Sequence, residues 1–104
     1  ISWASDSSDQ INIQFLSSGS FTLNADSNTS PLDGQKITFR ISGGTFAGAV
    51  GGYLTVTTSG SRSFGYRGVT LPNNLFIAAN TYLYMGCIFN STANKWDVVA
   101  LTQG

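Results

Sequence analysis

The amino-acid sequence predicts an all-β domain: a small antiparallel β-sandwich of jelly-roll-like form, with about six to eight strands. Short runs in which apolar and polar residues alternate are separated by turn formers such as Gly, Asn and Ser, the pattern of half-buried strands. The composition agrees, because charged residues make up 10% of the chain, against about 25% in typical globular proteins. Glu is absent, so few strong helix formers remain to cover an exposed helix.

The first two strands are predicted at residues 11–15 and 21–23, where apolar residues occupy every second position. Between them lies the turn signal Ser-Ser-Gly at residues 17–19. Because two strands joined by a short turn usually pair with each other, we expect an N-terminal β-hairpin here.

The clearest alternation in the chain lies in residues 36–41. Ile37, Phe39 and Ile41 face one side of the expected strand, while Lys, Thr and Arg face the other. Residues 43–52, which follow, are rich in Gly and Ala. That segment is either a flexible loop or a closely packed turn.

Several shorter elements are expected in the second half of the chain. Residues 53–58 predict another strand, and residues 62–68 predict a short strand or an ordered loop. The Leu-Pro-Asn-Asn sequence at 71–74 predicts a turn. The apolar run at 75–79 is ambiguous, because it is compatible with a short helical turn.

The last third of the chain predicts a terminal β-hairpin, with strands at 82–90 and 95–101 joined by Ser-Thr-Ala-Asn. Tyr82 and Tyr84 share one face of the first strand, and the opposite face is also apolar. A second subunit would most simply cover the outer side of such a strand in a small sandwich. Tyr82 and Tyr84 are therefore candidate interface residues, and Trp96 is expected to be a packed core or interface residue.

The 104 residues are expected to form one domain at 11–104, preceded by a lead-in segment or linker at 1–10. Because the chain begins with Ile1 and not Met, we expect it to be a fragment or a processed product. The formal net charge is +0 and the basic residues are scattered, which argues against nucleic-acid binding. No apolar run approaches the roughly 18 residues of a membrane span.

The sequence predicts no catalytic site, no metal site and no cofactor, so the chain is not expected to be an enzyme. It contains no His, which excludes Ser-His and Cys-His nucleophile pairs within the chain. Residues 26–30 begin like a calcium-binding loop, but Pro31 and Ile37 stand where that loop needs Gly and Glu. An active site shared with a neighbouring domain stays open as an alternative.

Cys87 is the only cysteine of the chain. Its position inside an apolar strand-like run predicts a buried, unreactive thiol. A single cysteine also excludes an internal disulfide framework, so packing, hydrogen bonding or oligomerisation must stiffen the domain.

Some aromatic residues have polar, Gly-rich surroundings, and we expect Trp3, Tyr53 and Tyr66 to form exposed stacking surfaces. Arg62 and Arg67 flank Tyr66, and the combination of planar donors with an aromatic ring is typical of surfaces that bind sugars or proteins. The candidate ligand-binding residues are therefore Arg62, Tyr66, Arg67 and Tyr53. Alternatively, the two arginines only solubilise this edge and guard it against strand pairing.

Four sequence elements together resemble those of a known family. They are the Asp-Gly-Gln-Lys turn with its alternating strand (33–41), the segment ending in Leu-Pro (68–72), the strand at 82–90 and the sequence Lys-Trp-Asp-Val-Val-Ala (95–100). With these elements the chain resembles the carboxyl-terminal β-domains of bacteriophage tail fibres and tailspikes, over most of residues 11–101.

The resemblance implies a homotrimeric, stable and non-enzymatic end of a longer fibre, with the preceding fibre or tailspike domains as partners. It implies an extracellular location on the virion, in the phage tail or another surface appendage. The implied function is to cap and stabilise the fibre, with contact to a glycan or protein receptor on the host surface as a further expectation. Gly34, Tyr82, Tyr84 and Trp96 are the expected structural or interface residues.

Two alternatives from other functional classes remain open. One is a capsid-decorating or head-fibre protein with a purely structural role. The other is a monomeric carbohydrate-binding module that binds soluble glycan through one aromatic face. A hydrolase with its active site at a subunit interface is a third, more distant possibility.

Overall fold

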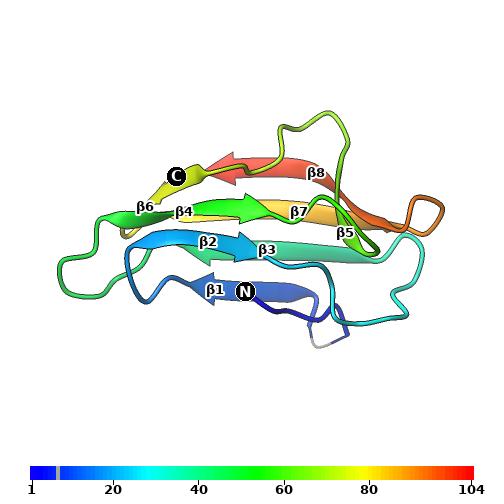
Figure 1. Ribbon diagram of the computed structural model, residues 1–104, viewed down its shortest axis with the longest axis horizontal. Coiled ribbons are helices and arrows are strands. Elements are labelled where there is room, and N and C mark those ends of the chain that lie inside the picture. Colours follow the sequence, from blue (N-terminus) through cyan, green and yellow to red (C-terminus); the bar gives the residue numbers. More distant parts are fainter. Residues whose placement is uncertain (7) are drawn as a thin grey trace.

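The computed structural model describes residues 1–6 and 8–104 and confirms the all-β prediction. No helix occurs in this described part, and its eight strands form two sheets, which Figure 1 shows as two layers. The five-stranded sheet has the order β1-β3-β7-β8-β5, and the three-stranded sheet has the order β2-β4-β6. The bounds are β1 Gln10–Gln14, β2 Gly19–Leu23, β3 Lys36–Ser42, β4 Gly51–Val56, β5 Ser63–Tyr66, β6 Leu75–Ala78, β7 Tyr82–Asn90 and β8 Lys95–Gln103.

The chain changes sheet at every connection except the last. Strands β1, β3 and β5 lie in the larger sheet, whereas β2, β4 and β6 lie in the smaller one. Only β7 and β8 follow each other within one sheet, and they pair as the predicted terminal hairpin. The predicted hairpin between β1 and β2 is therefore wrong, because these two strands belong to different sheets.

This alternating path also corrects the expectation of antiparallel sheets. Parallel neighbours need a crossover connection, and for β1–β3 and β2–β4 the intervening strand in the other sheet supplies it, so both of these pairs are parallel. The pair β5 and β8 is parallel as well. The β3–β7, β4–β6 and β7–β8 pairs are antiparallel, so both sheets are mixed.

The first crossing between the sheets is held by two aromatic rings. Phe15 follows β1 directly, is 2% exposed, and donates its backbone N–H to the carbonyl of Ser42 over 3.1 Å. Its ring stacks on that of Phe21 in β2, with the centroids 4.3 Å apart. The turn signal at 17–19 is present in the sequence, but burial of these rings takes the chain across the core instead of back along β1.

The glycine-rich segment at 43–52 is a closely packed element, one of the two readings left open above. A Cβ atom at Gly43 would lie 2.1 Å from the carbonyl oxygen of Ala78. At Gly51 a Cβ would lie 2.2 Å from the carbonyl oxygen of Ile77. Only glycine allows this close approach of two backbones. The approach pairs β4 with residues 75–78, so β6 is a strand and not the helical turn that we considered.

One buried cluster joins the two sheets. Its members are Trp3, Phe15, Leu23, Ile37, Phe39, Ile41, Leu54, Val56, Phe64, Ile77, Leu83, Met85, Cys87, Phe89, Trp96 and Val98. The inward side of β3 is therefore as predicted, and Trp96 is a core residue with no exposed surface.

Trp3 is the main correction to the predicted core. We expected an exposed stacking residue, but Trp3 is 5% exposed, and its ring meets that of Phe39 edge-on with the centroids 4.7 Å apart. The first residues, expected as a lead-in segment or linker, contact β2: the amino terminus of Ile1 donates to the carbonyl of Thr22 over 2.7 Å. Backbone hydrogen bonds beside β2 thus hold the N-terminal segment so that Trp3 joins the core cluster.

The carboxylate of Asp26 lies in the core at 1% exposure and accepts three hydrogen bonds. Oδ1 accepts the backbone N–H groups of Ser5 and Asn28, both over 2.9 Å. Oδ2 accepts the indole N–H of Trp96 over 3.1 Å. A buried carboxylate is tolerated only when its oxygens are satisfied in this way. Asp26 therefore links the N-terminal segment, its own loop and β8.

We predict that Gly43→Ala lowers the free energy of unfolding by at least about 2 kcal/mol, since the added methyl group meets backbone atoms that cannot rotate away. Gly86→Ala is the matched control, because a Cβ there meets only the Cβ of Ala100, at 3.6 Å. The control should change the free energy by less than about 0.5 kcal/mol. Urea unfolding followed by tryptophan fluorescence measures both values, and equal effects would contradict the packed segment.

Asp26→Ala is expected to cost about 3 kcal/mol or more, because it leaves two buried N–H donors and one partly buried N–H donor without an acceptor. Asp9→Ala, at an exposed position, serves as the control and should stay within about 0.5 kcal/mol of the parent. Chemical unfolding of both variants at neutral pH tests this expectation. A cost for Asp26→Ala no larger than that of the control would refute the linking role of Asp26.

Candidate functional site

The outer face of the five-stranded sheet presents two rows of side chains set by the strand register. One row joins Asn12, Arg40, Tyr84 and Thr102 across β1, β3, β7 and β8. The neighbouring row joins Gln14, Ser42 and Tyr82. Residues directly opposite each other in paired strands project from the same side of a sheet. We call these seven residues the tyrosine face.

Both tyrosines of this face are accessible, with Tyr82 39% and Tyr84 42% exposed, while Leu83 and Met85 on the inner side of β7 have no exposed surface. The guanidinium carbon of Arg40 lies 5.4 Å from the centroid of the Tyr82 ring, a cation–π contact. The tyrosines thus have polar neighbours on the adjacent strands, so the outer side of β7 is less apolar than the strand sequence alone suggested.

A shallow cavity of about 230 Å³ opens beside Tyr82 at the β1 end of the tyrosine face. Gln14 bounds it together with Thr45 from the loop after β3, and the side-chain amide of Gln14 donates to the hydroxyl of Thr45 over 2.9 Å. The lining residues are Asn12, Ile13, Gln14, Arg40, Ser42, Thr45 and Tyr82, and none of them is acidic. We call this space the outer cavity. It offers an aromatic ring, a cation and several amide and hydroxyl groups at one place.

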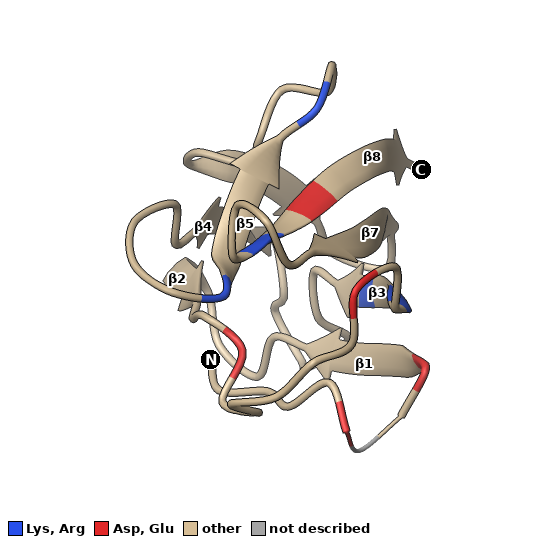
Figure 2. Ribbon diagram, turned by 90° about the vertical axis from the view of Figure 1, so that its right-hand side faces the viewer, with Lys and Arg blue, Asp and Glu red and all other residues tan. Residues whose placement is uncertain are grey.

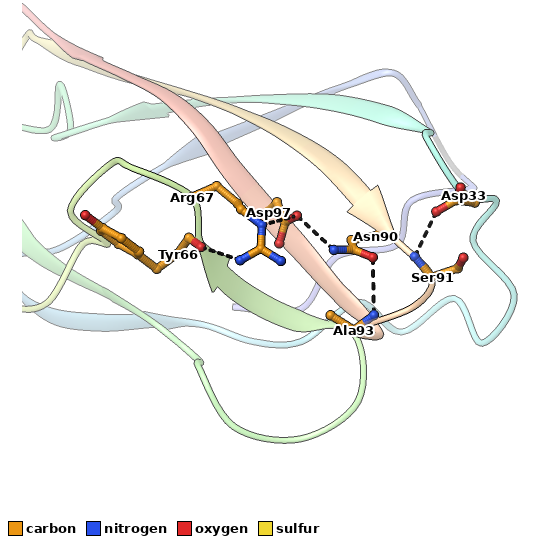
Figure 3. A network of polar contacts seen from close by, with 7 residues as sticks. All are labelled: Asp33, Tyr66, Arg67, Asn90, Ser91, Ala93 and Asp97. Atoms are coloured by element: carbon orange, nitrogen blue, oxygen red, sulfur yellow. Dashed lines mark hydrogen bonds and ion pairs between the residues drawn. The ribbon is translucent and has the colours of Figure 1, made fainter.

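The segment 62–67 carries three of the predicted ligand-binding residues, and both of its arginine side chains contact other groups of the same chain. Arg67 forms an ion pair with Asp97 over 3.1 Å and donates to the carbonyl of Tyr66 over 2.9 Å, as Figure 3 shows. Arg62 donates its Nε to the carbonyl of Asp26 over 3.2 Å. Tyr66, at the end of β5, remains 60% exposed. The two arginines therefore help to hold loops in place, while Tyr66 and the Arg67 side chain, which is 55% exposed, stay accessible to solvent.

The fourth predicted ligand-binding residue, Tyr53, lies on a different surface. It is 42% exposed on β4 of the three-stranded sheet and contacts Phe76, with ring centroids 5.1 Å apart. Tyr66 lies in β5 at an edge of the other sheet. The structure does not bring Tyr53 together with the segment 62–67.

Gly34 has a structural role in a tight turn. Its φ of +80° lies in the left-handed region that favours glycine, and its N–H donates to the carbonyl of Phe89 over 2.8 Å. The preceding Asp33 accepts the N–H of Ser91 over 2.9 Å, a contact drawn in Figure 3. This hydrogen bond lowers the pKa of Asp33 below its ordinary value. Gly34 and Asp33 thus attach the 26–35 loop to the terminal hairpin.

A second depression, of about 380 Å³, lies where β8 ends near the connection between β5 and β6. It is lined by Thr70, Leu71, Pro72, Asn73, Leu75 and Leu101, and we call it the apolar groove. Leu71, Leu75 and Leu101 are only partly buried and pack against the edge of the core. The groove is a surface of a kind that a protein neighbour can cover.

Charges do not gather on any one surface. Figure 2 shows blue and red stretches spread over separate loops and strands. Among residues 1–6 and 8–104, no group of three or more His, Cys, Asp or Glu is placed to hold a metal ion. Comparisons with known proteins found no matching family model, no matching curated protein and no matching solved structure. The described part of the chain contains no helix capable of spanning a membrane.

Sequence reasoning missed Asn12, Gln14, Arg40 and Thr45 as members of a site. The alternation in β3 already places Arg40 on the outward side, and that in β1 does the same for the two amides. No local sequence pattern indicates that β3 pairs with β1 on one side and with β7 on the other. The outer cavity results from those two pairings.

The thiol of Cys87 is 1% exposed, and burial, assisted by the charge of Asp97, raises its pKa from 9.0 to about 12. We expect a thiol-reactive disulfide to label it at pH 8 only after unfolding in urea. The unfolded chain releases this proton first, so the contribution of Cys87 to stability is complete below pH 9.0 and is lost as the pH rises towards about 12. Cys87→Ala should flatten this part of the stability profile, whereas rapid labelling of the folded protein would contradict the buried thiol.

Proposed function

We propose that this chain is a non-enzymatic attachment domain from the carboxyl end of a bacteriophage tail fibre or tailspike. Its two sheets form a jelly-roll-like β-sandwich, and three copies cap and stabilise a fibre on the outside of the virion. The tyrosine face binds a glycan or protein receptor on the host surface. The observation that supports this proposal most directly is the exposure of Tyr82 and Tyr84 beside Arg40 on the outer face of the five-stranded sheet.

The chemistry of the tyrosine face fits recognition of sugars. Exposed aromatic rings stack on the apolar side of a sugar ring, while planar amides and guanidinium groups bind its hydroxyls. Asn12, Gln14 and Arg40 supply those planar groups. Because they stand on strands and not on loops, their spacing is set by the sheet, which favours a preorganised binding surface.

The apolar groove is our candidate for the contact between subunits of the trimer. Its leucines are partly exposed in the single chain, and an interface core is typically apolar and covered on assembly. This choice leaves the tyrosine face open to a receptor, since the polar neighbours of Tyr82 and Tyr84 remove the need for a covering subunit.

The same open face supports a second candidate, a monomeric carbohydrate-binding module. That protein would bind soluble glycan through Tyr82 and Tyr84 in the same manner, but it would need no apolar contact with another copy. The mass of the protein in solution separates the two functions.

Light scattering during size-exclusion chromatography is expected to give three times the mass of the chain, and Leu71→Asp is expected to give one chain mass with an unchanged circular dichroism spectrum. Leu32→Asp is the control, because Leu32 is 74% exposed outside the groove.

In a second experiment, the parent should adsorb to bacterial cells or their surface polysaccharides, and Tyr84→Ala should reduce adsorption about tenfold. A monomeric parent that still binds glycan would favour the second candidate. A parent that adsorbs to nothing would overturn both.

A further inference from the structure

We propose that the outer cavity is a subsite for one acidic sugar ring, with Arg40 binding the carboxylate of a uronic acid within a surface polysaccharide. The inference rests on the proposed function and names the ligand class of the tyrosine face. Its support is the charge, the geometry and the size of the cavity.

The three arginines of the chain differ in their charge partners. Arg67 is paired with Asp97, and Arg62 donates to a backbone carbonyl. Among residues 1–6 and 8–104, Arg67 and Asp97 form the one ion pair. Arg40 is therefore a positive charge without a carboxylate partner in this part of the chain. No residue that lines the outer cavity is acidic. An anionic group is therefore the complement that this cavity lacks.

The geometry prepares Arg40 for such a group. Its guanidinium lies over the ring of Tyr82, and the side chain is only partly exposed, which limits its freedom before a ligand arrives. A guanidinium presents two parallel N–H donors to a carboxylate, a fit that a lysine ammonium does not offer. The carboxylate of a sugar ring can therefore be bound in one orientation.

Two amides complete the cavity on the side of β1. Gln14 donates its side-chain N–H to Thr45 over 2.9 Å, which holds its carbonyl oxygen as an acceptor for a sugar hydroxyl. Asn12 accepts from Gln10 over 2.8 Å, which orients its own amide N–H groups as donors. A sugar ring seated between these amides and Tyr82 meets both kinds of partner that its hydroxyls need.

The size of the cavity limits the ligand to one ring at a time. Its volume of about 230 Å³ is below the roughly 300–1,000 Å³ of pockets for drug-sized ligands. Tyr84 and Thr102 extend the same face beyond the cavity along the paired strands. The next sugar of a polysaccharide can lie on Tyr84 while the acidic ring occupies the cavity.

The test uses a panel of acidic bacterial polysaccharides, each presented beside its carboxyl-reduced form, in which the uronic acid has become a neutral hexose. Immobilised polysaccharides and the full 104-residue chain are used throughout. We expect at least one acidic form to bind, and carboxyl reduction to weaken its binding about tenfold or more. Arg40→Gln should cause a similar loss on the acidic form and little change on the reduced form.

Two further variants separate specific binding from general charge attraction. Lys36→Gln removes a positive charge from the same strand but outside the outer cavity, and it should change affinity less than threefold. Arg40→Lys retains the charge without the paired donors, and it should recover only part of the affinity. Equal losses for Lys36→Gln and Arg40→Gln would overturn the subsite, because they would indicate a non-specific electrostatic effect.

The outcomes also distinguish this inference from the proposed function. Binding that survives both carboxyl reduction and Arg40→Gln, yet is lost in Tyr84→Ala, would overturn the acidic-sugar subsite and leave the attachment function standing. No binding to any polysaccharide overturns the subsite. If the chain then also fails to adsorb to whole cells, the proposed function is overturned as well.

Discussion

The buried carboxylate of Asp26 is the interaction on which the rest of the structure depends. It lies 70 residues before Trp96, whose indole N–H it accepts, and it also accepts the backbone of Ser5 from the N-terminal segment. The backbone of Asp26 further pairs with Arg62, at the start of β5. Four parts of the chain thus meet at one charged group in the core. Because a charge buried without such partners is strongly unfavourable, the loop of Asp26 is compatible with few other arrangements.

The alternating path of the chain explains how such a small domain obtains a broad, regular outer surface. Each crossing between the sheets buries apolar residues, as Phe15 and Phe21 do after β1, and leaves the strands of each sheet to pair with non-consecutive partners. Gly51 allows β4 to approach β6 closely within the smaller sheet, and Gly43, which follows β3, lies against the backbone at the end of β6. The larger sheet is then free to present an ordered outer side, and the tyrosine face lies on it.

The basic side chains differ in the groups that they contact. Arg62 and Arg67 hold loops through a carbonyl and a carboxylate, and Lys95 donates to the carbonyl of Thr58 over 2.8 Å and to that of Gly60 over 3.2 Å. Arg40 differs, because its neighbours are an aromatic ring and uncharged amides. With few charges in total, a surface of hydroxyls, amides and aromatic rings remains, which suits recognition of a polyhydroxylated ligand more than of a nucleic acid.

The sequence by itself determined which side of a strand is buried, because alternation within a single strand decides that locally: β3, the terminal hairpin and the buried thiol of Cys87 were all predictable. Only the tertiary structure decided which strands pair, and with them the crossing after β1, the burial of Trp3 and the assembly of the outer cavity around Arg40. The residues of that cavity lie up to 70 positions apart, from Asn12 to Tyr82. Contacts between residues so far apart in the sequence depend on how the whole chain packs its core, so a local sequence pattern does not predict them.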